Sequence, residues 1–105
     1  MGNLESVARN VIAECAEDYV GLWSIIRRIR GTGVEDYPQL RTTTISLLKD
    51  LLRHRNIVAG QFRNDQFEEW HGSHEEILER IEREWIDLDR EPTIGDIAWF
   101  VRASH

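Results

Sequence analysis

The sequence predicts an α+β fold that is mostly helical, with about four helices and one small antiparallel hairpin or sheet. Three observations support this class. Apolar residues recur at helical spacing in several separate runs, one alternating stretch is centred on a polar turn, and a capping-box pattern opens the last long run. The 105 residues suit a single compact domain, 1–105.

The first two expected helices lie within the first 30 residues. Apolar residues from Leu4 to Cys15 recur every three or four positions. Asp18 is the expected N-cap of a second helix, with Gly21 near the join, so one bent helix and two separate helices both fit the pattern. The glycines of GTG, 31–33, end this segment because paired glycines favour left-handed backbone conformations.

A third helix is expected to begin near Pro38, since proline is preorganised for a first helical turn. Leucines and other apolar residues continue its helical spacing, and it ends near Asn56. The β-branched run 42–45 weakens its first half, so two short helices also fit.

The next stretch, NIVAGQFRNDQFEEW (56–70), reads as a strand, a polar turn and a second strand. We expect Phe62 to face Phe67 across a four-residue loop, 63–66, with Ala59 opposite Trp70 on the other face of the ribbon. An isolated ribbon is only marginally stable, so this hairpin must pack on the helices.

A fourth helix is expected to begin at Ser73, which forms a capping-box pattern with Glu76. Its apolar stripe places Trp85 in the core against the leucines of 47–52, together with Ile77 and Ile81. Loss of the cap should make Ser73→Ala more destabilising than Ser104→Ala near the chain end. The final stretch, IGDIAWFVR, fits both a third strand and a short closing helix.

The inventory of reactive residues indicates a protein that is not an enzyme. No nucleophile elbow, phosphate-binding loop or dinucleotide fingerprint occurs, and Cys15 lies on an apolar stripe, where a small core residue is expected. His71 and His74 are three residues apart at a helix start, which is weak evidence for a metal site. We therefore expect no catalytic residues, no metal and no cofactor.

The composition favours a soluble cytoplasmic protein. No segment approaches the roughly 20 apolar residues of a membrane span, and a single cysteine fits a reducing compartment. The net charge of −6 is unevenly spread. Residues 1–67 carry 9 Lys/Arg and 8 Asp/Glu, whereas residues 68–105 carry 4 and 11. Such asymmetry marks either a partner surface or a solvated helix face.

The segment YPQLRTTTISLLKDLLRHRNIVAGQFRNDQFEEW, with LWSIIRRIR as a preceding helix, resembles a bacterial winged-helix domain over roughly residues 22–70. In that family the helix before the hairpin enters the DNA major groove and the hairpin contacts phosphates. The resemblance implies DNA-binding roles for Arg41, Lys49, Arg53, Arg55 and, at the hairpin tip, Arg63. The hairpin itself has a net charge of −2, however, which favours packing on the core or contact with a protein over contact with phosphates.

A small, acidic, cysteine-poor chain without catalytic residues also resembles bacterial immunity proteins and antitoxins as a class. Such proteins inhibit a toxin by occupying it, often with carboxylates at a basic active site. Here the segment 68–91 carries ten acids and three arginines, with Trp70 and Trp85 nearby. We expect a protein partner with a basic surface, and nucleic acid is the less favoured partner. The expected contact residues are Glu68, Glu69, Glu75, Glu79, Glu82 and Asp87.

Overall fold

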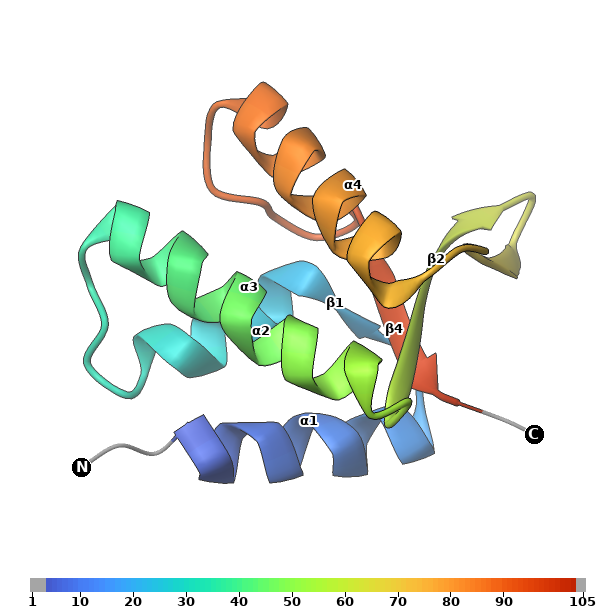
Figure 1. Ribbon diagram of the computed structural model, residues 1–105, viewed down its shortest axis with the longest axis horizontal. Coiled ribbons are helices and arrows are strands. Elements are labelled where there is room, and N and C mark those ends of the chain that lie inside the picture. Colours follow the sequence, from blue (N-terminus) through green and yellow to red (C-terminus); the bar gives the residue numbers. More distant parts are fainter. Residues whose placement is uncertain (1–3, 104–105) are drawn as a thin grey trace.

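The computed structural model describes residues 4–103, which fold as α+β, mostly helical, with a small antiparallel sheet (Figure 1). This confirms the predicted fold class. Ser104 lies outside the described residues. In chain order the elements are α1 (Leu4–Glu17), β1 (Val20–Gly21), α2 (Leu22–Arg30), α3 (Tyr37–Arg53), β2 (Ile57–Arg63), β3 (Gln66–Glu69), α4 (His74–Leu88) and β4 (Trp99–Arg102).

The four strands form one antiparallel sheet in the order β1-β4-β2-β3. The C-terminal stretch is therefore a strand, and it lies between β1 and β2, far from both in sequence. Trp99 pairs with Gly21 on one side and with Gly60 on the other. Because β4 pairs with β1 along one edge and with β2 along the other, it joins the hairpin to the N-terminal part of the chain.

Strand β1 separates α1 from α2, so the first 30 residues contain two helices and not one bent helix. The prediction that Asp18 caps the second helix was wrong. Gly21 is the N-cap of α2 and makes no side-chain cap hydrogen bond, while Asp18 Oδ1 accepts from the N–H of Tyr19 at 2.7 Å. The pairing of β1 with β4 sets this boundary, and a local capping signal cannot report it.

Helix α3 is a single helix in spite of its β-branched residues. Asp36 caps it by accepting from the N–H of Gln39 at 3.1 Å, and Pro38 lies in the first turn, as predicted. The Thr42 and Thr44 hydroxyls donate to the carbonyls of Pro38 and Leu40, which satisfies these groups within the helix. The helix ends at Arg53, one turn before the expected end, because Arg55 has a positive φ of 58°.

The hairpin confirms Phe62 opposite Phe67, but the loop is shorter than the four residues expected. Arg63 pairs with Gln66, which leaves Asn64 and Asp65 as a two-residue turn with φ values of 53° and 66°. Two positive φ values are typical of a type I′ turn, and Asn and Asp tolerate that conformation better than most residues.

Both termini of α4 have specific caps. Ser73 Oγ accepts from the Glu76 N–H at 3.1 Å and Glu76 Oε1 accepts from the Ser73 N–H at 2.9 Å, so the predicted capping box is present. Asp89, at φ 58°, ends the helix. Trp85 and Ile81 are fully buried in the same core cluster as Leu47, whereas Ile77 is only partly buried.

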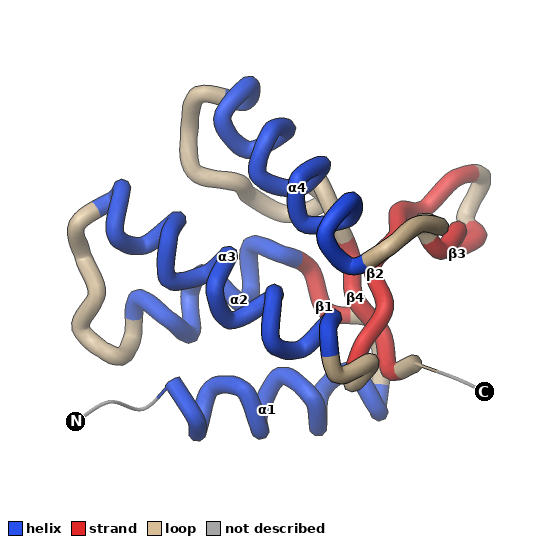
Figure 2. The backbone as a smooth tube through the Cα atoms, viewed as in Figure 1, coloured by secondary structure: helices blue, strands red, loops and turns tan. Residues whose placement is uncertain are grey.

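The helices lie to one side of the sheet (Figure 2). Ala59 and Phe100, which pair with each other, are fully buried on the helix-facing side. Because side chains alternate along a strand, their neighbours Gly60 and Trp99 belong to the opposite side. Ahead of β4, the Ala98 N–H donates to the Asp96 carbonyl at 2.8 Å around Ile97, whose φ is 67°. This tight γ-type turn is strained for a β-branched residue.

Candidate protein-binding surfaces

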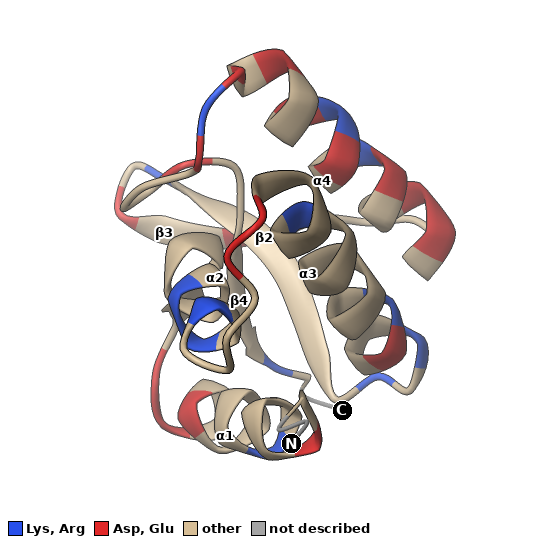
Figure 3. Ribbon diagram, turned by 90° about the vertical axis from the view of Figure 1, so that its left-hand side faces the viewer, with Lys and Arg blue, Asp and Glu red and all other residues tan. Residues whose placement is uncertain are grey.

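The outward side of α4 carries a stripe of carboxylates. At about 100° per residue, Glu75, Glu79 and Glu82 fall on one side of the helix, and Ile86 continues the row one turn after Glu82. All four are exposed, and Ile86 keeps 52% of its surface exposed. We call these four residues the α4 stripe. Asp87 is also exposed but lies about a quarter-turn away around the helix. Figure 3 shows acidic residues along the length of α4.

The carboxylates of the α4 stripe form few ion pairs with the other described residues. Within residues 4–103, Glu79 and Glu82 form no ion pair within 4.0 Å, and Glu75 has only His74 nearby, at 3.8 Å. The carboxylate that does pair along the helix is Glu84, which accepts from Arg80 at 2.8 Å. The stripe is therefore available to cations outside the chain.

The two predicted contact residues on β3 do not extend this stripe as one row. Glu68 and Glu69 are consecutive on a strand, so their side chains point to opposite sides of the ribbon, and both are exposed. Glu68 also pairs with Arg63 across the hairpin, at 3.5 Å.

The two tryptophans near the acidic segment, Trp70 and Trp85, are both buried. The Trp85 indole N–H donates to the Tyr37 hydroxyl at 2.7 Å, and Trp85 has no exposed surface. Trp70 retains 8% exposure, and the Arg80 guanidinium lies 3.8 Å from its ring centroid. Neither indole is accessible to a partner in this structure.

Several cations are neutralised inside the chain. Arg28 pairs with Glu14, and Arg30 donates to both carboxylate oxygens of Glu91, which raises the pKa of the Arg30 guanidinium. Two of the three arginines of the α2 sequence RRIR, 27–30, are thus committed to carboxylates. The positive charge that the sequence gathers there is largely balanced in three dimensions.

The cations at the end of α3 form the remaining basic group. Lys49, Arg53 and Arg55 are exposed and form no ion pair within 4.0 Å among the described residues. Arg41 lies near the other end of α3, about 18 Å from Arg53 along the helix, and is half-buried. Helix-turn-helix proteins contact bases mainly with N-terminal residues of the recognition helix, where α3 offers only Arg41.

The side of the sheet away from the helices carries four aromatic rings: Tyr19, Phe62, Phe67 and Trp99. The sequence predicted the Phe62–Phe67 pair but not its grouping with Tyr19 and Trp99. We call them the aromatic face. The Tyr19 ring centroid lies 4.9 Å from that of Phe62 and 5.0 Å from that of Phe67, and the Phe62 and Trp99 centroids are 5.4 Å apart. Tyr19 and Phe62 remain about 40% exposed, at 41% and 40%. Exposed apolar rings that gather in one place make this side of the sheet a candidate interaction site.

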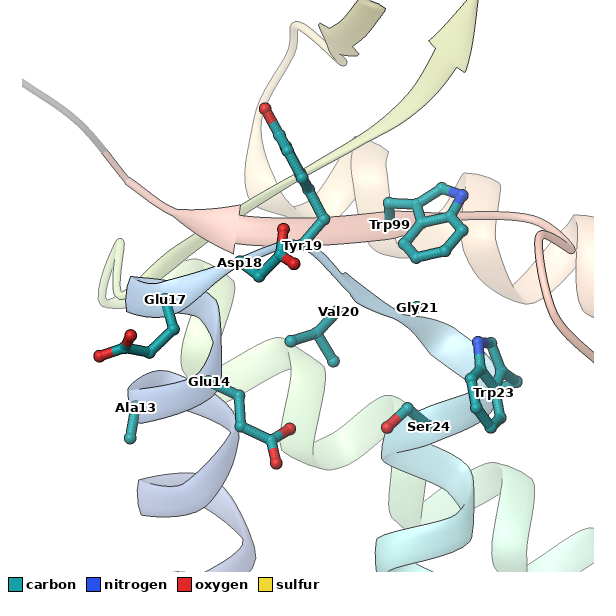
Figure 4. Close-up of a pocket in the computed structure, with 10 residues that line it drawn as sticks. All are labelled: Ala13, Glu14, Glu17, Asp18, Tyr19, Val20, Gly21, Trp23, Ser24 and Trp99. Carbon is teal, nitrogen blue, oxygen red and sulfur yellow. The ribbon is translucent and has the colours of Figure 1, made fainter. Parts of the chain in front are cut away.

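A pocket of about 480 Å³ opens beside the aromatic face, between the end of α1, β1 and the start of α2. Figure 4 shows Trp23 and Trp99 on one side of it, and Glu14 and Glu17 on the α1 side. Asp18 also lines the pocket. We call it the α1–β1 pocket, and its walls combine indole rings with carboxylates.

The surroundings of Cys15 and Asp96 shift the pKa of each side chain. Cys15 is 1% exposed, and burial raises the pKa of its thiol to about 12, so the reactive thiolate is suppressed. The hydrogen bond from Arg90 lowers the pKa of Asp96, which also accepts from Thr93. Among the described residues no group of three or more His, Cys, Asp or Glu could hold a metal ion.

Comparisons with family models, with curated proteins and with solved structures find no match to this chain. Over residues 4–103, the helices are all too short or too polar to cross a membrane.

Proposed function

We propose that this chain is a non-enzymatic cytoplasmic protein-binding domain that recognises a basic surface on a partner protein. The α4 stripe carries the proposal. Its carboxylates lie in a row that ends at the exposed Ile86, and among residues 4–103 Glu79 and Glu82 form no ion pair within 4.0 Å. An exposed apolar residue at the end of a row of carboxylates offers a contact that excludes water next to charges that steer a basic partner.

The immunity and antitoxin class is the form of this function that we favour. Inhibitors of that kind place carboxylates against a basic active site, and the α4 stripe offers such carboxylates on a rigid, doubly capped helix. A helix whose ends are fixed presents its side chains with little further loss of conformational entropy on binding.

The test begins with the partner that co-purifies with the tagged protein. Glu79→Lys combined with Glu82→Lys should slow association by about tenfold at low salt and change dissociation much less, because exposed interfacial charges act mainly on the on-rate. The matched control is Glu5→Lys with Glu35→Lys, which changes the net charge equally at exposed positions outside α4. Equal slowing by the two double variants would contradict a specific role for the stripe.

A winged-helix DNA-binding regulator is the second candidate, favoured by Lys49, Arg53 and Arg55, which are exposed and form no ion pair with any residue of 4–103. Duplex binding through these residues must weaken steeply with salt. We expect no specific duplex binding at physiological salt. A nanomolar, sequence-specific gel shift that is lost in Arg53→Ala with Arg55→Ala would replace the first proposal with this one.

A further inference from the structure

We propose that the α1–β1 pocket binds an arginine side chain of the partner protein, a role separate from that of the α4 stripe. The inference rests on the proposed partner with a basic surface. It adds a specific subsite on another part of the molecule, defined by the walls of the pocket and by the charge at its mouth.

The walls suit a flat cation. Tyr19, Trp23 and Trp99 line the pocket, and all three retain some exposed surface. Aromatic rings attract cations through the negative potential of their faces, and a guanidinium stacks on a ring more readily than an ammonium does. The same chain already places guanidinium groups over indoles, since Arg80 lies 3.8 Å from the Trp70 centroid and Arg27 lies 5.7 Å from that of Trp23.

The charge at the mouth has the complementary sign. Glu14, Glu17 and Asp18 line the pocket, and the only cation paired with any of them among the described residues is Arg28, on Glu14. With Arg27, which lies 5.7 Å from the Trp23 centroid, the local balance is about −1. Among residues 4–103, Glu17 and Asp18 form no ion pair, and Asp18 accepts from the N–H of Tyr19. An entering guanidinium would therefore meet two carboxylates that have no cation to give up.

The size of the pocket and its backbone support a side-chain ligand. Its volume of about 480 Å³ falls within the range of small-ligand sites, roughly 300–1,000 Å³. Gly21 forms part of its floor, and a Cβ atom there would lie 2.7 Å from the Trp23 indole, so glycine allows the close approach of this ring. Trp99, opposite Gly21 in the sheet, is held from the other side by Phe62.

The test uses N-acetyl-arginine amide as the probe and the four indole N–H signals of the protein in ¹H–¹⁵N spectra as the readout. We expect saturable shifts of the Trp23 and Trp99 signals with a millimolar dissociation constant, while the buried Trp85 signal stays in place. N-acetyl-citrulline amide has the same shape without the charge, and it should bind at least about tenfold more weakly. Equal binding of citrulline, or equally tight binding of N-acetyl-lysine amide, would overturn the assignment to arginine.

Matched variants separate this pocket from the α4 stripe. Glu17→Gln with Asp18→Asn should weaken probe binding by about three- to tenfold, as expected for two exposed carboxylates. Glu79→Gln with Glu82→Gln removes the same charge from α4 and should leave probe binding unchanged. If both pairs weakened it equally, the attraction would come from net charge and the pocket proposal would fail. Loss of partner association in the α4 variants alone would leave the proposed function standing without this subsite.

Discussion

The α4 stripe and the aromatic face are both exposed, but the side chains that meet the solvent are mostly carboxylates on the first and apolar rings on the second. On α4, the apolar residues Ile81 and Trp85 turn inward and the carboxylates turn outward, so the helix is polar wherever it meets water. On the sheet, Phe100 is fully buried while its neighbour in sequence, Trp99, lies on the side away from the helices. Here an apolar ring meets the solvent.

The two surfaces contribute differently to the stability of the fold. The outward carboxylates of α4 contribute little to the core, so selection for binding can change them freely. The rings of the aromatic face contact one another at 4.9–5.7 Å and therefore stabilise the sheet as well as forming a surface. Substitutions should consequently affect stability in different proportions on the two surfaces.

The largest effect is expected for the inner side of α4, at Trp85. Trp85→Ala should cost about 3–5 kcal/mol, because truncation of a fully buried aromatic leaves a cavity. The Tyr37 hydroxyl also loses its donor. A small domain has only about 5–15 kcal/mol in total, so thermal unfolding should show a severe loss or no folded protein. Trp85→Phe keeps most of the packing and should cost clearly less. An unchanged midpoint in Trp85→Ala would mean that α4 does not bury its apolar stripe.

A smaller effect is expected at the start of α4. Ser73→Ala should cost about 0.5–2 kcal/mol, because the amide of Glu76 loses its acceptor. Ser46 is a matched control, since it is exposed within α3 and caps nothing. Denaturant unfolding should show a loss for Ser73→Ala and almost none for Ser46→Ala. Equal losses would indicate that the capping box does not fix this helix end.

The elements that the sequence predicted well are those specified by local chemistry. The Ser73 capping box and the Phe62–Phe67 register follow from residues close together in the chain, and the structure has both. The boundary at Gly21 and the position of β4 follow from a pairing between residues about 80 positions apart, and local patterns do not report such pairings. Bringing residues so far apart in the chain together costs loop-closure entropy, and the packing of the whole fold offsets that cost.

The candidate site also contains some features that local sequence patterns predict and others that depend on pairing between distant strands. Periodicity placed Glu75, Glu79 and Glu82 on the outer side of a helix, and the structure exposes all three. It could not separate Trp99 from Phe100, because both are large aromatics in one short strand and only the sheet decides which of them is covered. The glycines on either side of Trp99 in the sheet, Gly21 and Gly60, were a signal, but only the register reveals that they are its neighbours.

The smallest effect on stability is expected for Ile86, the exposed apolar residue of the α4 stripe. Ile86→Ala should change the free energy of unfolding by no more than about 0.5 kcal/mol, because its side chain is half exposed on α4 and alanine is the better helix former. Phe62→Ala should cost more, about 1 kcal/mol, because Phe62 is 40% exposed but contacts three other rings. Thermal midpoints of the two variants, measured together with partner affinity, give the readout.

If Ile86 anchors the partner, Ile86→Ala should weaken binding by tenfold or more with the fold intact, as expected for a hot-spot residue worth over about 1.4 kcal/mol. Unchanged affinity in Ile86→Ala, with a loss in Phe62→Ala beyond its effect on stability, would move the partner from the α4 stripe to the aromatic face.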